Sequence, residues 1–175
     1  VDDNGRTLKS YSAWRCMLER CYSDNYQAKN PTYKGCSVHS EWHSYDVFLL
    51  WYSDNYIEGY TLDKDILING NKVYSSKTCV FIPQEINKLL NSRSRSTGDY
   101  PKGVYLDKRR NRIMSQINVN GRTKFLGRFD CKYKAHDAYV SAKKEYVKSV
   151  SELYFLDGLI CKGVFISLNS WADSM

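Results

Sequence analysis

The segment 59–91 holds the side chains best suited to chemistry in this chain of 175 residues. Two carboxylates, Asp63 and Asp65, flank Lys64 there. A carboxylate can hold a hard cation or accept a proton from water. The simpler alternative is that both are turn or strand-edge carboxylates that pair with Lys64 or Lys72, so the elements around them decide what they can do.

The elements of this segment are expected in the order strand, loop, strand, helix. Residues 61–66 alternate in a pattern compatible with a β-strand. A short apolar run at 79–82 predicts a second strand, and Pro83 suits the first turn of a following helix. Upstream, apolar residues recur at helical spacing over 11–22 and 44–51, so a helix is expected in each.

The six cysteines lie at irregular spacings without a C-x-x-C pair, which favours free thiols in a reducing compartment. Disulfides and a zinc site are the alternatives, and a structural zinc ion is not expected. Such a zinc site would be formed by Cys16, Cys21, Cys36 and Cys79. His39 or His43 could replace one of these cysteines as a ligand.

A step in charge divides the chain. The net charge of +7 falls almost wholly on residues 91–152, which hold 15 Lys and Arg against 6 Asp and Glu, whereas residues 1–90 hold 10 against 11. A localised basic module favours nucleic-acid binding, the alternative being a solvated basic surface. The predicted organisation is a first domain (1–90), a basic linker (91–100), a sheet-and-helix domain (101–152) and an apolar tail (153–175). The tail either packs back on a domain or mediates self-association.

The basic module has the pattern of a three-stranded sheet covered by one helix. Residues 104–106 predict the first strand, and 112–119 alternate as the second. The Asn-Gly pair at 120–121 is a strong signal for a tight hairpin, from which 123–129 return as the third strand. A helix over 133–150 would supply the cover that this sheet needs. The fold class is therefore α+β.

The basic module resembles the APETALA/ethylene-response-factor type of DNA-binding domain, in which a three-stranded sheet lies in the major groove and a helix packs behind it. The matching features are Gly103-Val104, the alternation from Ile113 to Val119, Asn120-Gly121, Leu126-Gly127-Arg128-Phe129, and Ala135 with Ala138-Tyr139. The resemblance implies that basic side chains on the exposed sheet face touch DNA, and the candidates are Arg109, Arg110, Arg112, Arg122, Lys124 and Arg128. The central strand presents Met114, Gln116 and Asn118 where relatives often have arginines, and Gln and Asn can pair with adenine edges.

Most of 11–150 is similar to phage HNH homing endonucleases that carry such a module. The resemblance rests on W-x-x-M-L-x-R-C-Y at 14–22, Tyr33 with Val38, Trp42 and Phe48, L-D-K-D-I at 62–66, and G-N-x-x-Y-S-x-x-x-C at 70–79. It implies an HNH-like ββα-metal domain ahead of the sheet-and-helix domain. In such a domain Asp63 on the first strand and Asn87 on the helix would hold a divalent cation, Mg²⁺ or Mn²⁺.

The sequence departs from this family at the general base, because the expected His directly after the carboxylate is replaced by Lys64. A lysine with its ordinary pKa is charged at neutral pH and cannot accept a proton. The base would then be Asp65 acting through a water, or His39 or His43 from the preceding element. The catalytic candidates are Asp63, Lys64, Asp65 and Asn87.

The function that these observations predict is that of a DNA-binding phage protein, a homing-type HNH endonuclease or nickase acting on double-stranded DNA. Arg93 and Arg95 of the linker would follow the DNA backbone. The alternative is a catalytically inactive HNH-derived DNA-binding or regulatory protein, which Lys64 favours, and RNA binding is a third possibility. Without a long apolar stretch or a leader pattern, we expect no membrane contact and a location in the host cytoplasm.

Overall fold

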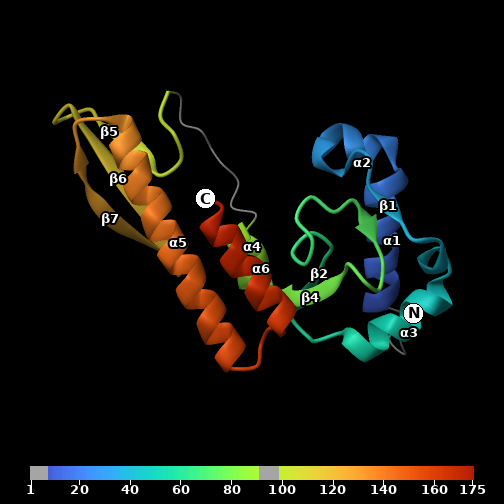
Figure 1. Ribbon diagram of the computed structural model, residues 1–175. Coiled ribbons are helices and arrows are strands. Elements are labelled where there is room, and N and C mark those ends of the chain that lie inside the picture. The colour runs from blue at the N-terminus through green and yellow to red at the C-terminus, as the bar shows by residue number, and fades with distance from the viewer. Residues whose placement is uncertain (1–7, 91–98) are drawn as a thin grey trace. The chain divides into compact units, whose positions relative to one another are not determined.

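The computed structural model describes residues 8–90 and 99–175, whose course Figure 1 shows. They form a mixed α+β structure, as predicted. The chain divides into two compact units: the first unit ends at Asn87 and the second unit begins at Lys88. Arg93 and Arg95, which the sequence suggested as contacts to the DNA backbone, lie outside the described residues.

The first unit combines helices with two small two-stranded sheets. Its helices are α1 (Lys9–Tyr22), α2 (Asp24–Lys29) and α3 (Tyr45–Asn55), with 3-10 turns at Pro31–Tyr33 and Ser40–His43. In one sheet β1 (Ser37–Val38) pairs in parallel with β3 (Val73–Tyr74). In the other β2 (Tyr60–Asp63) is antiparallel to β4 (Val80–Pro83), and α4 (Gln84–Leu90) follows directly.

Aromatic side chains fill the core of the first unit. The ring of Trp42 lies 5.1 Å from that of Phe48 and 4.7 Å from that of Trp51. Trp51 in turn stacks on Phe81 of β4 at 5.6 Å. On the side of α1, Trp14 Nε1 donates a 2.8 Å hydrogen bond to the carbonyl of Trp42. This cluster connects α1 and α3 to β4, and so holds the β2–β4 pair in place.

The boundaries of the predicted strand–loop–strand–helix segment differ from the structure, most of all at the end of the first strand and at Pro83. The strand predicted over 61–66 ends at Asp63, because its Oδ1 accepts the N–H groups of Asp65 and Ile66, both at 2.8 Å. These bonds form a local turn that takes the chain out of the ladder. Pro83, predicted to lie in the first turn of the helix, instead closes β4, and the helix begins at Gln84.

The second unit contains the predicted three-stranded antiparallel sheet. Its order is β5 (Val104–Asp107), β6 (Arg112–Val119) and β7 (Arg122–Phe129). Helix α5 (Lys132–Leu156) lies across one face of the sheet and runs beyond the predicted end at residue 150. The apolar tail forms a further helix, α6 (Lys162–Asp173), which packs along α5 (Figure 1).

Helix α5 approaches the sheet closely at Gly103. Gly103, at φ +82°, lies against the ring of Tyr139, and a Cβ built on Gly103 would fall 2.1 Å from Tyr139 Cδ2. Only glycine fits this position, because it combines positive φ with backbone contact. Further along α5, the buried Lys143 donates from Nζ to the carbonyl of Leu89 at 3.1 Å.

Candidate functional site

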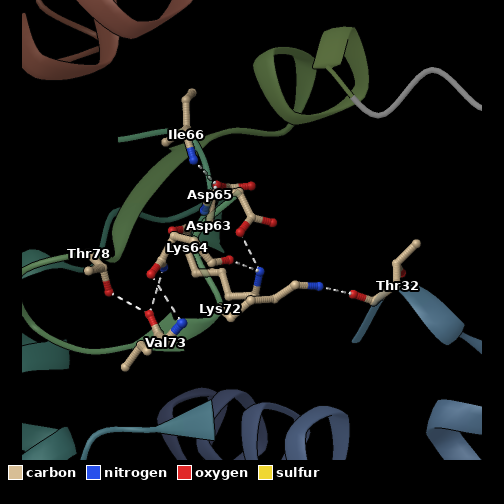
Figure 2. A network of polar contacts seen from close by, with 9 residues as sticks. Thr32, Asp63, Lys64, Asp65, Ile66, Lys72, Val73 and Thr78 are labelled. Atoms are coloured by element: carbon tan, nitrogen blue, oxygen red, sulfur yellow. Dashed lines mark hydrogen bonds and ion pairs between the residues drawn. The ribbon is translucent and has the colours of Figure 1, made fainter. Parts of the chain in front are cut away.

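Lys64 closes the loop that follows β2 (Figure 2). Its side chain is buried, pairs with the carboxylate of Asp65 and donates to the carbonyl of Asn71 at 3.0 Å. Asn71 returns a 2.7 Å bond from Nδ2 to the carbonyl of Lys64 and another to that of Val73. The two residues therefore hold the loop from both sides.

The alternative for Asp63 and Asp65 was that both are turn or strand-edge carboxylates paired with Lys64 or Lys72, and the structure contains part of this arrangement. Asp65 pairs with Lys64, whereas Lys72 extends to the carbonyl of Thr32 at 2.8 Å. Asp63 is a turn carboxylate through the two N–H groups that its Oδ1 accepts. The Lys64 ammonium donates to the carboxylate of Asp65 and to the carbonyl of Asn71. Its role in the structure is therefore to stabilise the loop.

Asp63 and Asn87 come to the same face of the β2–β4 pair. Asn87 Nδ2 donates to Thr61 Oγ1 at 3.1 Å, which places this part of α4 over the face of β2 that bears Thr61. Residues two apart in a strand point to the same side, so the Asp63 side chain leaves β2 on that face as well. The two residues that the sequence predicted as metal ligands therefore lie on the same face of the β2–β4 pair.

The turn uses only one oxygen of the Asp63 carboxylate. Oδ2 has no hydrogen-bond partner within residues 8–90 and 99–175, while Oδ1 accepts the two N–H groups of the turn. Burial raises the pKa of Asp63, and those backbone hydrogen bonds oppose the rise. A nearby cation would stabilise the charged carboxylate. The oxygens of Asp63 and Asn87 are hard ligands of the kind that Mg²⁺ and Mn²⁺ prefer, so the donor set fits such an ion.

The two histidines that the sequence offered as a base are engaged elsewhere. His43 Nε2 lies 3.1 Å from the Tyr22 hydroxyl and 3.2 Å from the carbonyl of Val38. His39 Nδ1 faces Glu41 at 3.6 Å. In the part of the chain that the structure describes, no hydrogen bond or ion pair joins either ring to Asp63 or Asp65. All six cysteines are unpaired, and the described residues include no group of three or more His, Cys, Asp or Glu side chains placed to hold a metal.

Strand register sorts the side chains of the second-unit sheet into two faces. Val104, Ser115 and Ile117 are buried on the face toward α5. Side chains alternate along a strand, and directly paired residues point the same way. The residues that alternate with Val104, Ser115 and Ile117, together with their partners on the neighbouring strands, therefore form the other face. This open face consists of Tyr105, Asp107, Arg112, Met114, Gln116, Asn118, Thr123, Phe125 and Arg128.

Four of the ten predicted DNA-binding residues share the open face: Arg112, Gln116, Asn118 and Arg128. Arg112 and Arg128 are exposed, and Arg112 Nη1 lies 3.5 Å from the carboxylate of Asp130. Met114 lies on this face of the central strand, as expected, but is only 8% exposed.

The other basic candidates lie at the ends of the strands. Arg122 is paired with Val119 and Lys124 with Ile117, so both leave β7 on the side toward α5, where they are exposed beside the hairpin. There Tyr146 of α5 donates from its hydroxyl to Asn120 Oδ1 at 2.8 Å, which ties the hairpin to the helix.

At the other end of the strands, the turn between β5 and β6 carries Arg109 and Arg110, both exposed. Asp107 Oδ1 accepts the N–H of Arg109 at 3.0 Å and holds this turn closed. The ten candidates therefore divide among the open face, the helix side of β7, the turn between β5 and β6, and the linker outside the described residues.

The sequence missed two residues of the open face, Thr123 and Phe125. A β-bulge in β7 makes Leu126 an extra residue, since Ser115 pairs with Gly127 and the next residue of β6, Gln116, pairs with Phe125. A glycine inside a strand pattern often indicates such a bulge, and Gly127 was the residue in the sequence that indicated this one.

Comparisons with known proteins identify no relative: no family model matches the chain, and neither the curated proteins nor the solved structures contain a similar one. Among the described residues, no helix is both long enough and apolar enough to span a membrane.

Proposed function

We propose that this protein binds double-stranded DNA through the open face of the β5–β7 sheet. The observation that carries the proposal is that the sheet has one face covered by α5 and one face that presents Arg112 and Arg128 beside Gln116 and Asn118. Residues 91–152 also hold 15 of the 26 basic residues of the chain. Cations that neutralise phosphates, interleaved with amides that can pair with base edges, match what duplex DNA offers in its major groove.

The roles follow from position. Arg112 and Arg128 stand on the open face, where a guanidinium can bind phosphate oxygens or a guanine edge. The amides of Gln116 and Asn118, on the central strand, would face the base edges. Arg122 and Lys124, displaced toward the helix side at the hairpin, would contact phosphates beyond the sheet.

Salt-dependent binding tests this proposal. The affinity for a duplex should fall as salt rises, and Arg128→Gln should weaken binding and reduce the slope of log K against log salt by about one unit. Lys162→Gln, the same loss of charge on α6, is the matched control and should leave both unchanged. Equal effects of the two variants would contradict a contact surface on the open face.

A second function, DNA cleavage by the first unit, is supported by the placement of Asp63 and Asn87 on one face of the β2–β4 pair. In this proposal the first unit is an HNH-like endonuclease or nickase, Mg²⁺ or Mn²⁺ supplies Lewis-acid chemistry at the scissile phosphate, and the two residues hold it. The alternative is a scaffold that binds DNA without cutting it. The burial of Lys64 in its loop contacts favours that alternative, because this position then supplies no base.

A nicking assay on supercoiled DNA with Mg²⁺ or Mn²⁺ distinguishes an active nuclease from a scaffold that only binds DNA. Asp63→Asn keeps an oxygen for the N–H groups of the turn and removes the charge, so it should abolish cleavage while the protein stays folded. Asn87→Ala should have the same effect. Lys77→Gln, a charge change on a surface residue of the first unit, should cleave normally. Cleavage that persists in Asp63→Asn would refute the proposed metal site, and its absence from the wild type with duplex binding intact would support the inactive scaffold.

A further inference from the structure

Phe125 is a large apolar side chain that the fold turns toward solvent. It is 52% exposed on the open face, and none of the ring contacts within the described residues involves it. In the register of the sheet it stands directly opposite Gln116 of the central strand. An apolar ring and an amide therefore project side by side from the middle of the face that we propose for DNA binding.

The bulge in β7 is what puts Phe125 there. Arg128 pairs with Met114 on the open face, and strict alternation from Arg128 would direct residue 126 outward and residue 125 toward α5. Because Leu126 is the extra residue of the bulge, the alternation is reset and Phe125 points outward. The local irregularity thus turns toward the open face an aromatic ring that a regular strand would have directed toward α5.

The chemistry of this pair matches one kind of base pair. A glutamine amide can bond both N6 and N7 of adenine, and an apolar side chain can contact the C5-methyl group of thymine. Both features lie on the major-groove edge of an A·T pair, and directly opposed residues of a sheet keep their Cβ atoms only about 5 Å apart. The neighbouring opposed pair, Asn118 with Thr123, repeats the combination of an amide and a methyl-bearing side chain.

We infer that Gln116 and Phe125 together give this protein a preference for A·T base pairs, with Gln116 on adenine and Phe125 on the thymine methyl group. The inference rests on the proposed binding of duplex DNA by the open face. It adds the residues that would determine which sequence is bound.

Three short duplexes test it: alternating A·T, the same duplex with uracil in place of thymine, and alternating G·C. The full-length protein should bind the A·T duplex about fourfold more tightly than the uracil duplex, as the loss of one buried methyl group implies. It should bind the A·T duplex at least about fivefold more tightly than the G·C duplex. Phe125→Ala should remove the discrimination between thymine and uracil, and Gln116→Leu should reduce that between A·T and G·C.

The control is Leu156→Ala, which truncates a 75% exposed apolar side chain at the end of α5 and should leave both preferences intact. Equal affinity for all three duplexes, with normal salt dependence, would overturn the inference and leave the proposed DNA binding standing. A preference for thymine that survives in Phe125→Ala would also overturn the part assigned to Phe125. Failure to bind any duplex at low salt would refute the proposed function itself.

Discussion

Replacing Lys143 with methionine should stabilise the second unit at neutral pH, although it removes a hydrogen bond. The side chain is only 7% exposed, and its Nζ donates to the carbonyl of Leu89 at 3.1 Å. Burial, together with a smaller effect of the positive charge of Lys102, lowers the pKa of Lys143 from 10.5 to about 8. The protein therefore keeps a charge in an environment that disfavours it.

The size of the effect follows from that pKa difference. A fall from 10.5 to about 8 corresponds to roughly 3 kcal/mol of penalty on the charged form. Loss of the hydrogen bond to Leu89 would offset about 1 kcal/mol of this. Lys143→Met should therefore gain about 2 kcal/mol at pH 7, which for a unit of this size raises Tm by about 10 °C.

The pH dependence has a defined sign. Between pH 8 and 10.5 the unfolded chain still holds the proton on Lys143 while the folded chain has lost it, so this group makes the wild type more stable as pH rises. The advantage of Lys143→Met should shrink across that window. Calorimetric unfolding of the full chain at pH 7 and pH 10 measures both, with Lys144→Met as the control. A destabilised variant at pH 7, or an advantage that does not change with pH, would refute the reasoning.

Two further substitutions probe the packing of the second-unit sheet. Gly103→Ala should cost about 3 kcal/mol or more, because its Cβ would fall 2.1 Å from Tyr139 Cδ2 at positive φ. Gly121→Ala, at φ +76° with open space around it, should cost only about 1 kcal/mol of stability. Urea unfolding measures both variants, and equal losses of stability would contradict the contact between Gly103 and Tyr139. Ser115→Ala should gain about 1 kcal/mol, since its buried hydroxyl has no partner in the described part of the chain. Ser151→Ala should lose about as much, because that hydroxyl donates to a backbone carbonyl at 2.9 Å, and a loss in both would contradict the distinction.

Periodicity and turn chemistry predicted most of the elements, because these signals are local. The alternation over 112–119 and the Asn-Gly pair at 120–121 predicted a hairpin that the structure contains. The helical spacing over 11–22 corresponds to α1. The end of β2 at Asp63 was not predicted, because it depends on a side chain that accepts two backbone N–H groups rather than on polarity.

The candidate sites were harder to predict because they depend on contacts between distant parts of the chain. That Lys64 braces a loop follows from its bond to Asn71, which no spacing rule reveals. The exposure of Phe125 depends on a bulge whose only sequence signal was Gly127. Composition did indicate where the basic residues gather, but only the register separated Arg128, on the open face, from Lys124, on the helix side.

The most direct test of the central claim is the nuclear magnetic resonance spectrum of the ¹⁵N-labelled full chain during titration with duplex DNA. We predict that the amide signals of β6 and β7, with those of Gln116 and Phe125 among them, shift progressively, and that the shifts vanish at high salt. The signals of α6 should stay in place. Shifts concentrated on α5 and α6, with the sheet unaffected, would contradict the claim that the open face binds DNA.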